Sequence, residues 1–263
     1  MTTQELLWTA WDWEPSVVAG CVVLSLAYGA ACRPRSVPAC VSFLSGVFLL
    51  LLALVSPIDT LGDRYLFSAH VTQHFLLALI VPPLWLLGLP RPFAEAWLRR
   101  PSLRRTEHTL SQPLLAWSLG VGAMLLWHVP ALFNAALASD ALHILQHLSF
   151  LITGTIFWWP ILGPLEERRL PAFTAIAYLF SACVCCSLLG ALLTFMPPGA
   201  YPAYLNPDDP NGILRLVRGG WGLDPKTDQQ LGGLLMWVPG CLVYLSGILA
   251  TAARWYGAAE QEA

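Results

Sequence analysis

Seven apolar runs, separated by polar stretches, divide the chain. An α-helix of about 20 apolar residues crosses the hydrocarbon core of a bilayer, and every run is long enough to do so. No soluble domain lies between them, so we expect an all-α membrane protein, a seven-transmembrane-helix bundle forming one domain over residues 15–255. The runs cover residues 15–32, 37–56, 65–89, 113–134, 141–163, 170–196 and 231–255.

The distribution of basic residues predicts the orientation of the bundle. With the N-terminus outside, the inner connections hold ten Lys and Arg residues and the outer ones hold four, and cytoplasmic loops carry the Lys/Arg excess. The expected topology is therefore N-out/C-in. The inner residues are Arg33, Arg35, Arg91, Arg99, Arg100, Arg104, Arg105, Arg168, Arg169 and Arg254, and the outer ones are Arg64, Arg215, Arg218 and Lys226.

Two connections are long enough to have roles of their own. The segment 90–112 is basic and predicts an amphipathic cytoplasmic linker that lies on the membrane surface. The outer segment 197–230 is rich in Pro, Gly, Tyr and Asp. Loops of this length are usually functional or disordered, and its aromatic residues Tyr201, Tyr204 and Trp221 favour an ordered lid or a docking surface.

The composition agrees with a membrane protein. Of the 263 residues, 56% are hydrophobic and only 11% are charged, whereas soluble domains carry roughly 25% charged residues. The net charge of −2 argues against a nucleic-acid partner. The expected surroundings are membrane lipid, and the chain is expected to be a multi-pass membrane protein.

Histidines are the candidate chemistry. The stretch SAHVTQHFLLAL places His70 and His74 four residues apart in an apolar run, and LHILQHLSF does the same with His143 and His147. With His128, these are five of the six histidines, and they fall in the outer part of three consecutive predicted helices. Polar groups at membrane depth are costly and mark functional sites.

The spacing of these histidines predicts a metal site. Side chains four residues apart lie on one helix face, about 6 Å apart along the axis. Two such pairs on parallel helices, with His128 added, supply up to five imidazoles for one closed site or two adjacent ones. Imidazole suits copper and zinc. The alternative is that the rings form hydrogen bonds between helices.

Other polar residues could support or extend this site. Carboxylates and amides near the outer helix ends could orient the imidazoles, or could simply cap helices. Sulfur is the ligand that Cu(I) prefers, although small sulfur-containing residues also pack helices. The candidates for orientation are Asp59, Asp63, Asn134, Asp228 and Gln229, and those for sulfur ligation are Cys183, Cys186 and Met196.

Four motifs resemble one known family. SPIDTLGDRYLFSAHVTQHFLLALIVPPLWLLGLP, WHVPALFNAAL, LHILQHLSFLITGTIFWWP and DQQLGGLLMWVPG are similar to those of the polytopic CtaG-type cytochrome c oxidase assembly factors. The resemblance implies a bacterial plasma-membrane protein that is needed for active haem–copper oxidase and handles copper. The family's motifs map onto His70, His74, His128, His143 and His147, with Asp228 and Gln229. The CVCC stretch departs from the family pattern.

Three functions follow from these observations. The first is an assembly factor that binds copper at the outer face, with an apo cytochrome c oxidase subunit or a copper chaperone as its partner. The second is a zinc-dependent membrane hydrolase acting on lipid, in which Ser68 with Asp59 or Asp63 would complete the site. The third is a haem-binding protein. The leading hypothesis does not require an enzyme, and residue types do not indicate an oligomeric state.

Overall fold

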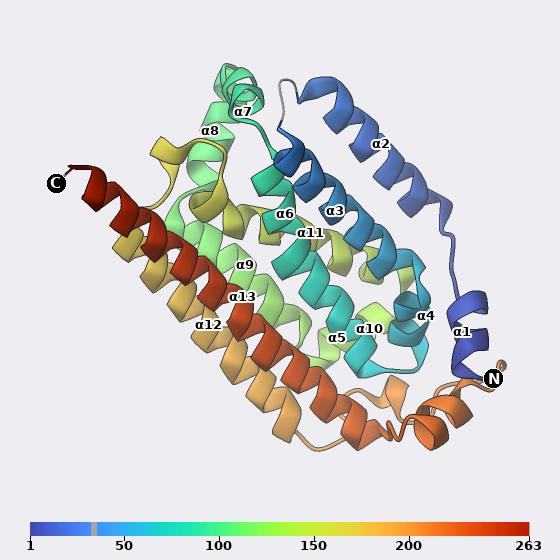
Figure 1. Ribbon diagram of the computed structural model, residues 1–263. Coiled ribbons are helices and arrows are strands. Elements are labelled where there is room, and N and C mark those ends of the chain that lie inside the picture. Colours follow the sequence, from blue (N-terminus) through green and yellow to red (C-terminus); the bar gives the residue numbers. More distant parts are fainter. Residues whose placement is uncertain (33–35, 263) are drawn as a thin grey trace.

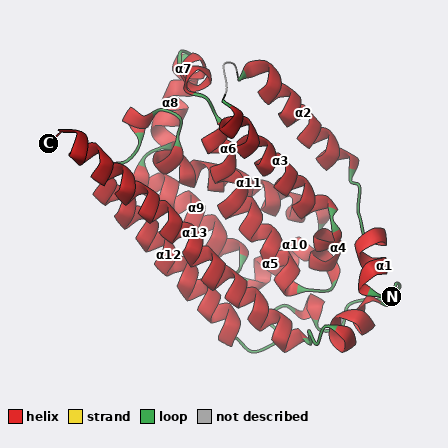
Figure 2. Ribbon diagram, viewed as in Figure 1, coloured by secondary structure: helices red, strands yellow, loops and turns green. Residues whose placement is uncertain are grey.

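The computed structural model describes residues 1–32 and 36–262, with the side chains of 258–262 left out. Arg33 and Arg35, which entered the prediction of orientation, therefore lie outside the described residues. Every regular element in the described part of the chain is helical (Figure 2). The prediction of an all-α protein is confirmed.

The helices follow the apolar runs closely. Short helices and turns lie between the long ones, and most of them begin at a proline, which has no N–H to leave unpaired in the first turn. In chain order the α-helices are α1 (Thr3–Thr9), α2 (Pro15–Ala31), α3 (Val37–Val55), α4 (Pro57–Arg64), α5 (Phe67–Phe75), α6 (Val81–Gly88), α7 (Arg91–Leu98), α8 (Pro101–Leu110), α9 (Pro113–Trp127), α10 (Pro130–Leu137), α11 (Asp140–Leu162), α12 (Ala172–Phe195) and α13 (Pro225–Glu262).

The described residues contain five helical segments that are long and apolar enough to cross a membrane, and a sixth if α8 and α9 count as one bent span. The helix α2 is apolar but shorter, with 17 residues. The chain is thus a multi-pass membrane protein, while the count of seven spans stays a prediction. The five segments are Val37–Val55, Phe67–Gly88, Asp140–Leu162, Ala172–Phe195 and Pro225–Gly257.

The predicted fourth span, 113–134, is interrupted. Helix α9 ends at Trp127, and α10 begins at Pro130. The ring of Pro130 disfavours a helical conformation at the preceding residue, and Val129 is extended, with φ −63° and ψ 124°. The break leaves His128 at the end of α9, inside the protein, instead of on the face of a continuous helix.

The predicted third span, 65–89, is continuous but not a regular α-helix. A π-helical turn over Leu76–Ile80 joins α5 to α6. Pro82 and Pro83 have no N–H to donate to the preceding turn, and the backbone N–H of Val81 donates to the carbonyl of Leu76 instead. Such widened turns are frequent at functional sites, and this one directly follows His74.

The bundle has two distinct ends (Figure 1). Helices α1, α4 and α10 and segment 197–230 gather at one end, which we term the histidine end, and α7, α8 and the C-terminus lie at the other, the arginine end. Described basic residues that were assigned to the inner side, such as Arg104 and Arg168, belong to the arginine end, and Arg218 belongs to the histidine end. Which end faces the cytoplasm stays a prediction.

Both long connections are folded. Segment 90–112 forms α7 and α8, and the axis of α8 meets that of α9 at 69°. Segment 197–230 contains a 3-10 turn at Pro202–Tyr204 and a π-helical turn at Arg215–Gly220. Its residues Ile213 and Val217 pack in a buried cluster with Leu6 of α1 and Leu61 of α4, so the segment covers the histidine end.

Candidate metal centre

The structure brings all five predicted histidines together. Helix α5 supplies His70 and His74, and the first turns of α11 supply His143 and His147 (α5 and α11 are labelled in Figure 1). The ring centroids are 5.2 Å apart for His70 and His143, and 5.7 Å apart for His74 and His147. The two i,i+4 pairs therefore face each other at the same depth. The ring of His128 lies 5.4 Å from that of His74.

Two glycines allow the supporting elements to approach α5 and the π-helical turn that closely. A Cβ on Gly154 of α11 would lie 2.7 Å from the backbone oxygen of Ala78, and one on Gly62 of α4 would lie 3.0 Å from the backbone nitrogen of His70. Both distances involve backbone atoms, which cannot rotate aside. A side chain at either position would push α11 or α4 away from the histidines.

The histidines are buried without partners for their nitrogens. Within the described residues, neither ring nitrogen of His70 or His74 has a hydrogen-bond partner, nor does Nε2 of His128, His143 or His147. His70 and His74 are at most 1% exposed. A buried polar group without a partner costs about 1–3 kcal/mol. By this geometry the nitrogens of His70 and His74 do not form the hydrogen bonds between helices that the alternative predicts.

Among the described residues, one hydrogen bond to a ring nitrogen of this cluster is present, and it orients His128. Its Nδ1 lies 2.7 Å from the carbonyl oxygen of Met124, one turn back along α9. That contact assigns the proton to Nδ1, since a carbonyl only accepts. Nε2 is then unprotonated and carries the lone pair that a metal ion needs, as is usual for metal-ligating histidines.

The geometry defines two overlapping groups that could hold an ion. In the first, potential ligand atoms of His70, His74 and His147 all lie within 4.8 Å of one another, and in the second the same holds for Asp63, His70 and His143. Two nitrogens bound to one ion are at most about 4.2 Å apart. Small rotations of the side chains would close either group, so the donor set fits a nitrogen-preferring metal.

Asp63 joins the cluster to a pocket at the surface. One of its oxygens, Oδ1, is buried 3.6 Å from Nε2 of His143, while 34% of the side chain is exposed. With Asp12, Asp59 and Arg64 it lines a pocket of about 500 Å³, which we term the acidic pocket. Burial raises the pKa of Asp63 to about 7, against the opposing effect of Arg64. Burial, followed by the charge of Asp63, raises the pKa of Asp59 to about 8.

Aromatic residues that the sequence did not point to enclose the histidines. The ring of Phe133 from α10 lies 4.8 Å from that of His70, and Phe150 from α11 lies 4.4 Å from that of His74. Two tyrosines of segment 197–230 reach in from above. The hydroxyl of Tyr201 donates to the carbonyl of His128 at 2.8 Å, and that of Tyr204 donates to the carbonyl of Gly62 at 2.7 Å. The segment is thereby fixed over the site.

Most of the polar residues predicted to orient the imidazoles do something else. Asp228 accepts hydrogen bonds from the backbone N–H groups of Phe67 and Ser68, at 2.7 and 3.1 Å, and from the Ser68 hydroxyl at 2.5 Å. It caps the first turn of α5, because a carboxylate matches the unpaired N–H groups there. Gln229 donates to the carbonyls of Leu193 and Met196.

Asn134 and Asp59 also bond elsewhere. The amide of Asn134 donates to the carbonyl of Ala200, and Asp59 accepts from the side chain of Gln73 at 2.7 Å. Of the five residues predicted to orient imidazoles, Asp63 is the one that lies within 4.0 Å of a histidine ring nitrogen in the described structure. A sequence gives the position of such residues along a helix, but their hydrogen bonds depend on how the helices are rotated.

The sulfur atoms form a separate group between α12 and α13. Cys183 and Cys186 were predicted as candidate sulfur ligands, but Sγ of Cys183 lies 3.3 Å from Sγ of Cys241, and the Cys186 thiol donates to the carbonyl of Met236. Among the described residues, neither Cys183 nor Cys186 belongs to either histidine group.

Comparison with known proteins decides the family. The model of the cytochrome c oxidase caa3 assembly factor family matches residues 20–258, nearly the whole chain. The chain belongs to this family. Membership supports a role in cytochrome c oxidase assembly, and it agrees with the resemblance seen in the four sequence motifs.

Relatives of the family member described here occur in mycobacteria. The chain is 26% identical over 270 residues to an uncharacterized protein of Mycobacterium leprae and 27% identical over 270 residues to one of Mycobacterium bovis. Each alignment covers 94% of this chain and 40% or 39% of the relative. The chain thus spans about two fifths of the length of the curated relatives it matches. No solved structure matches it.

Proposed function

We propose that this assembly factor binds copper as its cargo at the five histidines and passes it to an apo cytochrome c oxidase subunit at the outer face of the membrane. One observation carries the proposal. The nitrogens of His70 and His74 are buried at membrane depth with no hydrogen-bond partner in the described chain, and neutral imidazole is a ligand that copper accepts. Family membership supplies the setting, the assembly of an oxidase.

The arrangement suggests how an ion would enter. Asp12, Asp59 and Asp63 give the acidic pocket three carboxyl groups, and Arg64 and Met1 also line it. A cation drawn to these groups would next meet Asp63 with His70 and His143, and then the deeper group of His70, His74 and His147. His70 belongs to both groups, so an ion could move between them with one ligand retained.

A transfer site must also release its ion. The group formed by Asp63, His70 and His143 has a partly exposed carboxylate and lies next to the acidic pocket. The ligands of a partner protein can reach the ion there. A chaperone on the same side would deliver copper by the reverse route. The direction is set by the relative affinities of the partners.

The other two functions find less support. In the hydrolase hypothesis Ser68 would act at the metal, but its hydroxyl and backbone N–H are bonded to Asp228. In the haem hypothesis a macrocycle would have to fit between α5 and α11, where Phe133 and Phe150 pack against the imidazoles at 4.8 and 4.4 Å.

The test is the metal content of the purified protein after loading with copper or zinc, measured by plasma mass spectrometry. The double variant His70→Leu/His74→Leu removes four candidate nitrogens at nearly constant volume. Two matched controls are His108→Ala, which changes an exposed histidine of α8, and Cys183→Ser/Cys241→Ser, which removes the closest pair of sulfurs.

Copper at one or two equivalents, lost in the leucine variant and retained in both controls, is the expected result. Copper lost in the cysteine variant would assign the site to sulfur and contradict the proposal. Zinc alone at one equivalent would favour the hydrolase, and lipid hydrolysis would then be the next assay. A Soret absorbance band that disappears in the leucine variant would establish haem instead.

A further inference from the structure

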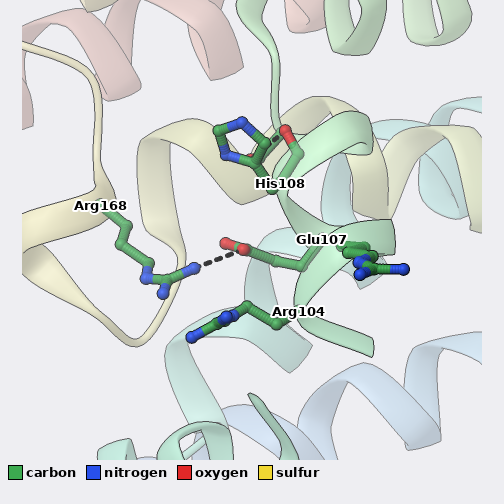
Figure 3. Close-up of a pocket in the computed structure, with 6 residues that line it drawn as sticks. Arg104, Glu107, His108 and Arg168 are labelled. Carbon is green, nitrogen blue, oxygen red and sulfur yellow. Dashed lines mark hydrogen bonds and ion pairs between the residues drawn. The ribbon is translucent and has the colours of Figure 1, made fainter. Parts of the chain in front are cut away.

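A second pocket lies at the arginine end of the bundle, opposite the histidine end. It is lined by Arg104, Arg105 and His108 of α8 and by Arg168 of the turn after α11, and its volume is about 540 Å³ (Figure 3). In Figure 3, Arg168 reaches from the turn after α11 toward Glu107 of α8, and Arg104 lies on the same side of α8 as Glu107. The pocket is thus built from two segments that are distant in sequence.

Its positive charge exceeds its negative charge. The buried carboxylate of Glu107 is paired with Arg168, at 2.5 Å, and accepts a hydrogen bond from the indole N–H of Trp159 at 3.2 Å. These contacts account for Glu107 and Arg168. Arg104 and Arg105 form no ion pair within the described residues. Two guanidinium groups are therefore left to face an anion, and guanidinium matches the oxygens of a phosphate.

An apolar slot adjoins this basic pocket. It holds about 150 Å³ and is lined by Trp97, Leu110, Ile156 and Trp159, and it shares Glu107 and Ser111 with the basic pocket. The polar site and the apolar site thus meet at the same two residues. A ligand that fits both has an anionic group and an apolar chain close together in one molecule.

The position of the pocket in the bundle is that of a lipid headgroup. The axis of α8 meets that of the apolar helix α9 at 69°. If α9 crosses the membrane and α8 lies on its surface, as the sequence predicts, the pocket lies where a surface helix meets a spanning one. The rings of Trp97 and Trp159 flank it, with centroids 6.3 Å apart. Tryptophan is enriched at the level of lipid headgroups, and basic pockets between helices at that level bind anionic headgroups.

We propose that this pocket binds the phosphate group of an anionic phospholipid, with the start of one acyl chain in the apolar slot. The guanidinium groups of Arg104 and Arg105 hold the phosphate, and the Glu107–Arg168 pair forms the wall. A free phosphate ion offers the same oxygens, but it leaves the apolar slot unused. The inference is independent of copper binding at the other end of the bundle.

Native mass spectrometry of delipidated protein, titrated with phosphatidylglycerol, phosphatidylcholine or inorganic phosphate, tests the proposal. The variant is Arg104→Gln/Arg105→Gln, and its matched control is Arg99→Gln/Arg100→Gln, which removes two exposed arginines of the same connection that do not line the pocket. Each basic residue near an anionic headgroup is worth about fivefold in affinity. We therefore expect phosphatidylglycerol to bind on the order of 25-fold more weakly to the variant, and nearly unchanged to the control.

A third variant, Ile156→Trp, separates the two sources of phosphate. Because the indole fills the slot, phosphatidylglycerol should bind more weakly to this variant, whereas the binding of inorganic phosphate should be unchanged. Equal losses in the Arg99/Arg100 control would show a diffuse surface charge, and equal binding of phosphatidylcholine would show that the anion is not recognised. Inorganic phosphate that displaces phosphatidylglycerol, together with an Ile156→Trp variant that binds normally, would show a free-phosphate site. Each of these results would overturn the proposal.

Discussion

Two sets of buried polar side chains lie next to each other along α5, Asp228 of α13 at its start and His70 with His74 one turn later, and they differ in one respect. At the start of the helix, Asp228 accepts hydrogen bonds from Phe67 and Ser68. One turn later, His70 and His74 have none for their ring nitrogens in the described chain. The first group explains itself as a structural cap. The unpaired ring nitrogens of the second group cost stability and gain no hydrogen bond within the described chain. Buried polar groups without a partner in the protein indicate a ligand site.

The distinction between these two sets would fail most clearly if His70 and His74 proved to stabilise the fold instead of binding a metal. Replacing both with leucine (His70→Leu/His74→Leu) should lower copper affinity on the order of 1000-fold or more, because each ligand of a structural metal site contributes several kcal/mol. The melting temperature of the metal-free protein in detergent should not fall, since two unpaired polar groups are replaced by apolar ones. A competition titration with a chelator and a melting curve measure both effects. A large drop in melting temperature without loss of copper would reverse the comparison.

The opposite behaviour is expected at the cap. Asp228→Ala leaves the N–H groups of Phe67 and Ser68 without their acceptor, and hydrogen bonds to a charged group contribute about 1.5–3 kcal/mol each. The free energy of unfolding should therefore fall by about 3 kcal/mol or more. Denaturation in mixed micelles would measure it, and a variant as stable as the native chain would mean that Asp228 has another role.

Gly62 allows α4 to pack closely against α5, the helix that carries His70 and His74. A Cβ there would lie 2.6 Å from Oε1 of Gln73 and 3.0 Å from the backbone nitrogen of His70. Gly62→Ala should cost about 1–3 kcal/mol through crowding, and it should weaken copper binding as α4 and Asp63 move outward. Gly257→Ala, where no atom of the described residues lies within 4 Å of an added Cβ, is the matched control. Equal stability of the two variants would show that the close approach is not required.

Asp63 predicts the smallest and most specific effects. Asp63→Asn should lower copper affinity by about tenfold, as removal of a supporting partner of a metal site does. In the metal-free protein its pKa of about 7 lies above the ordinary value of 3.8. A raised carboxyl pKa means that the folded state binds the proton more tightly, so this group's contribution to stability is lost as the pH rises from about 4 to 7. The Asn variant should lack that loss, which melting curves across this range would show.

The same pKa sets a pH dependence of binding. Below pH 7 the carboxyl of Asp63 must lose its proton before it can ligate, and the imidazoles must be neutral as well. Copper affinity should therefore decrease as the pH is lowered. A plot of the logarithm of the affinity against pH should have a slope between pH 5 and 7 that is smaller by about one in Asp63→Asn. Identical slopes would place Asp63 outside the site.

The sequence predicted a large part of this arrangement, because hydrophobic length and i,i+4 spacing are local properties. They indicated the helices and the meeting of His70 and His74 with His143 and His147. The interruption at Pro130 was also readable from the chain, through the conformation that proline imposes on the residue before it. What remained open depends on the rotation of each helix about its axis. This rotation decides the hydrogen bonds of Asp228, the contact of Cys183 with Cys241 and the enclosure of the histidines by Phe133.

Copper K-edge X-ray absorption of the loaded protein tests the central claim most directly. The account predicts a first shell of nitrogen at about 2.0–2.1 Å, with the outer-shell scattering of imidazole rings, and the loss of both in His70→Leu/His74→Leu. A first shell of sulfur at about 2.3 Å would contradict it and would place the metal at Cys183 and Cys241.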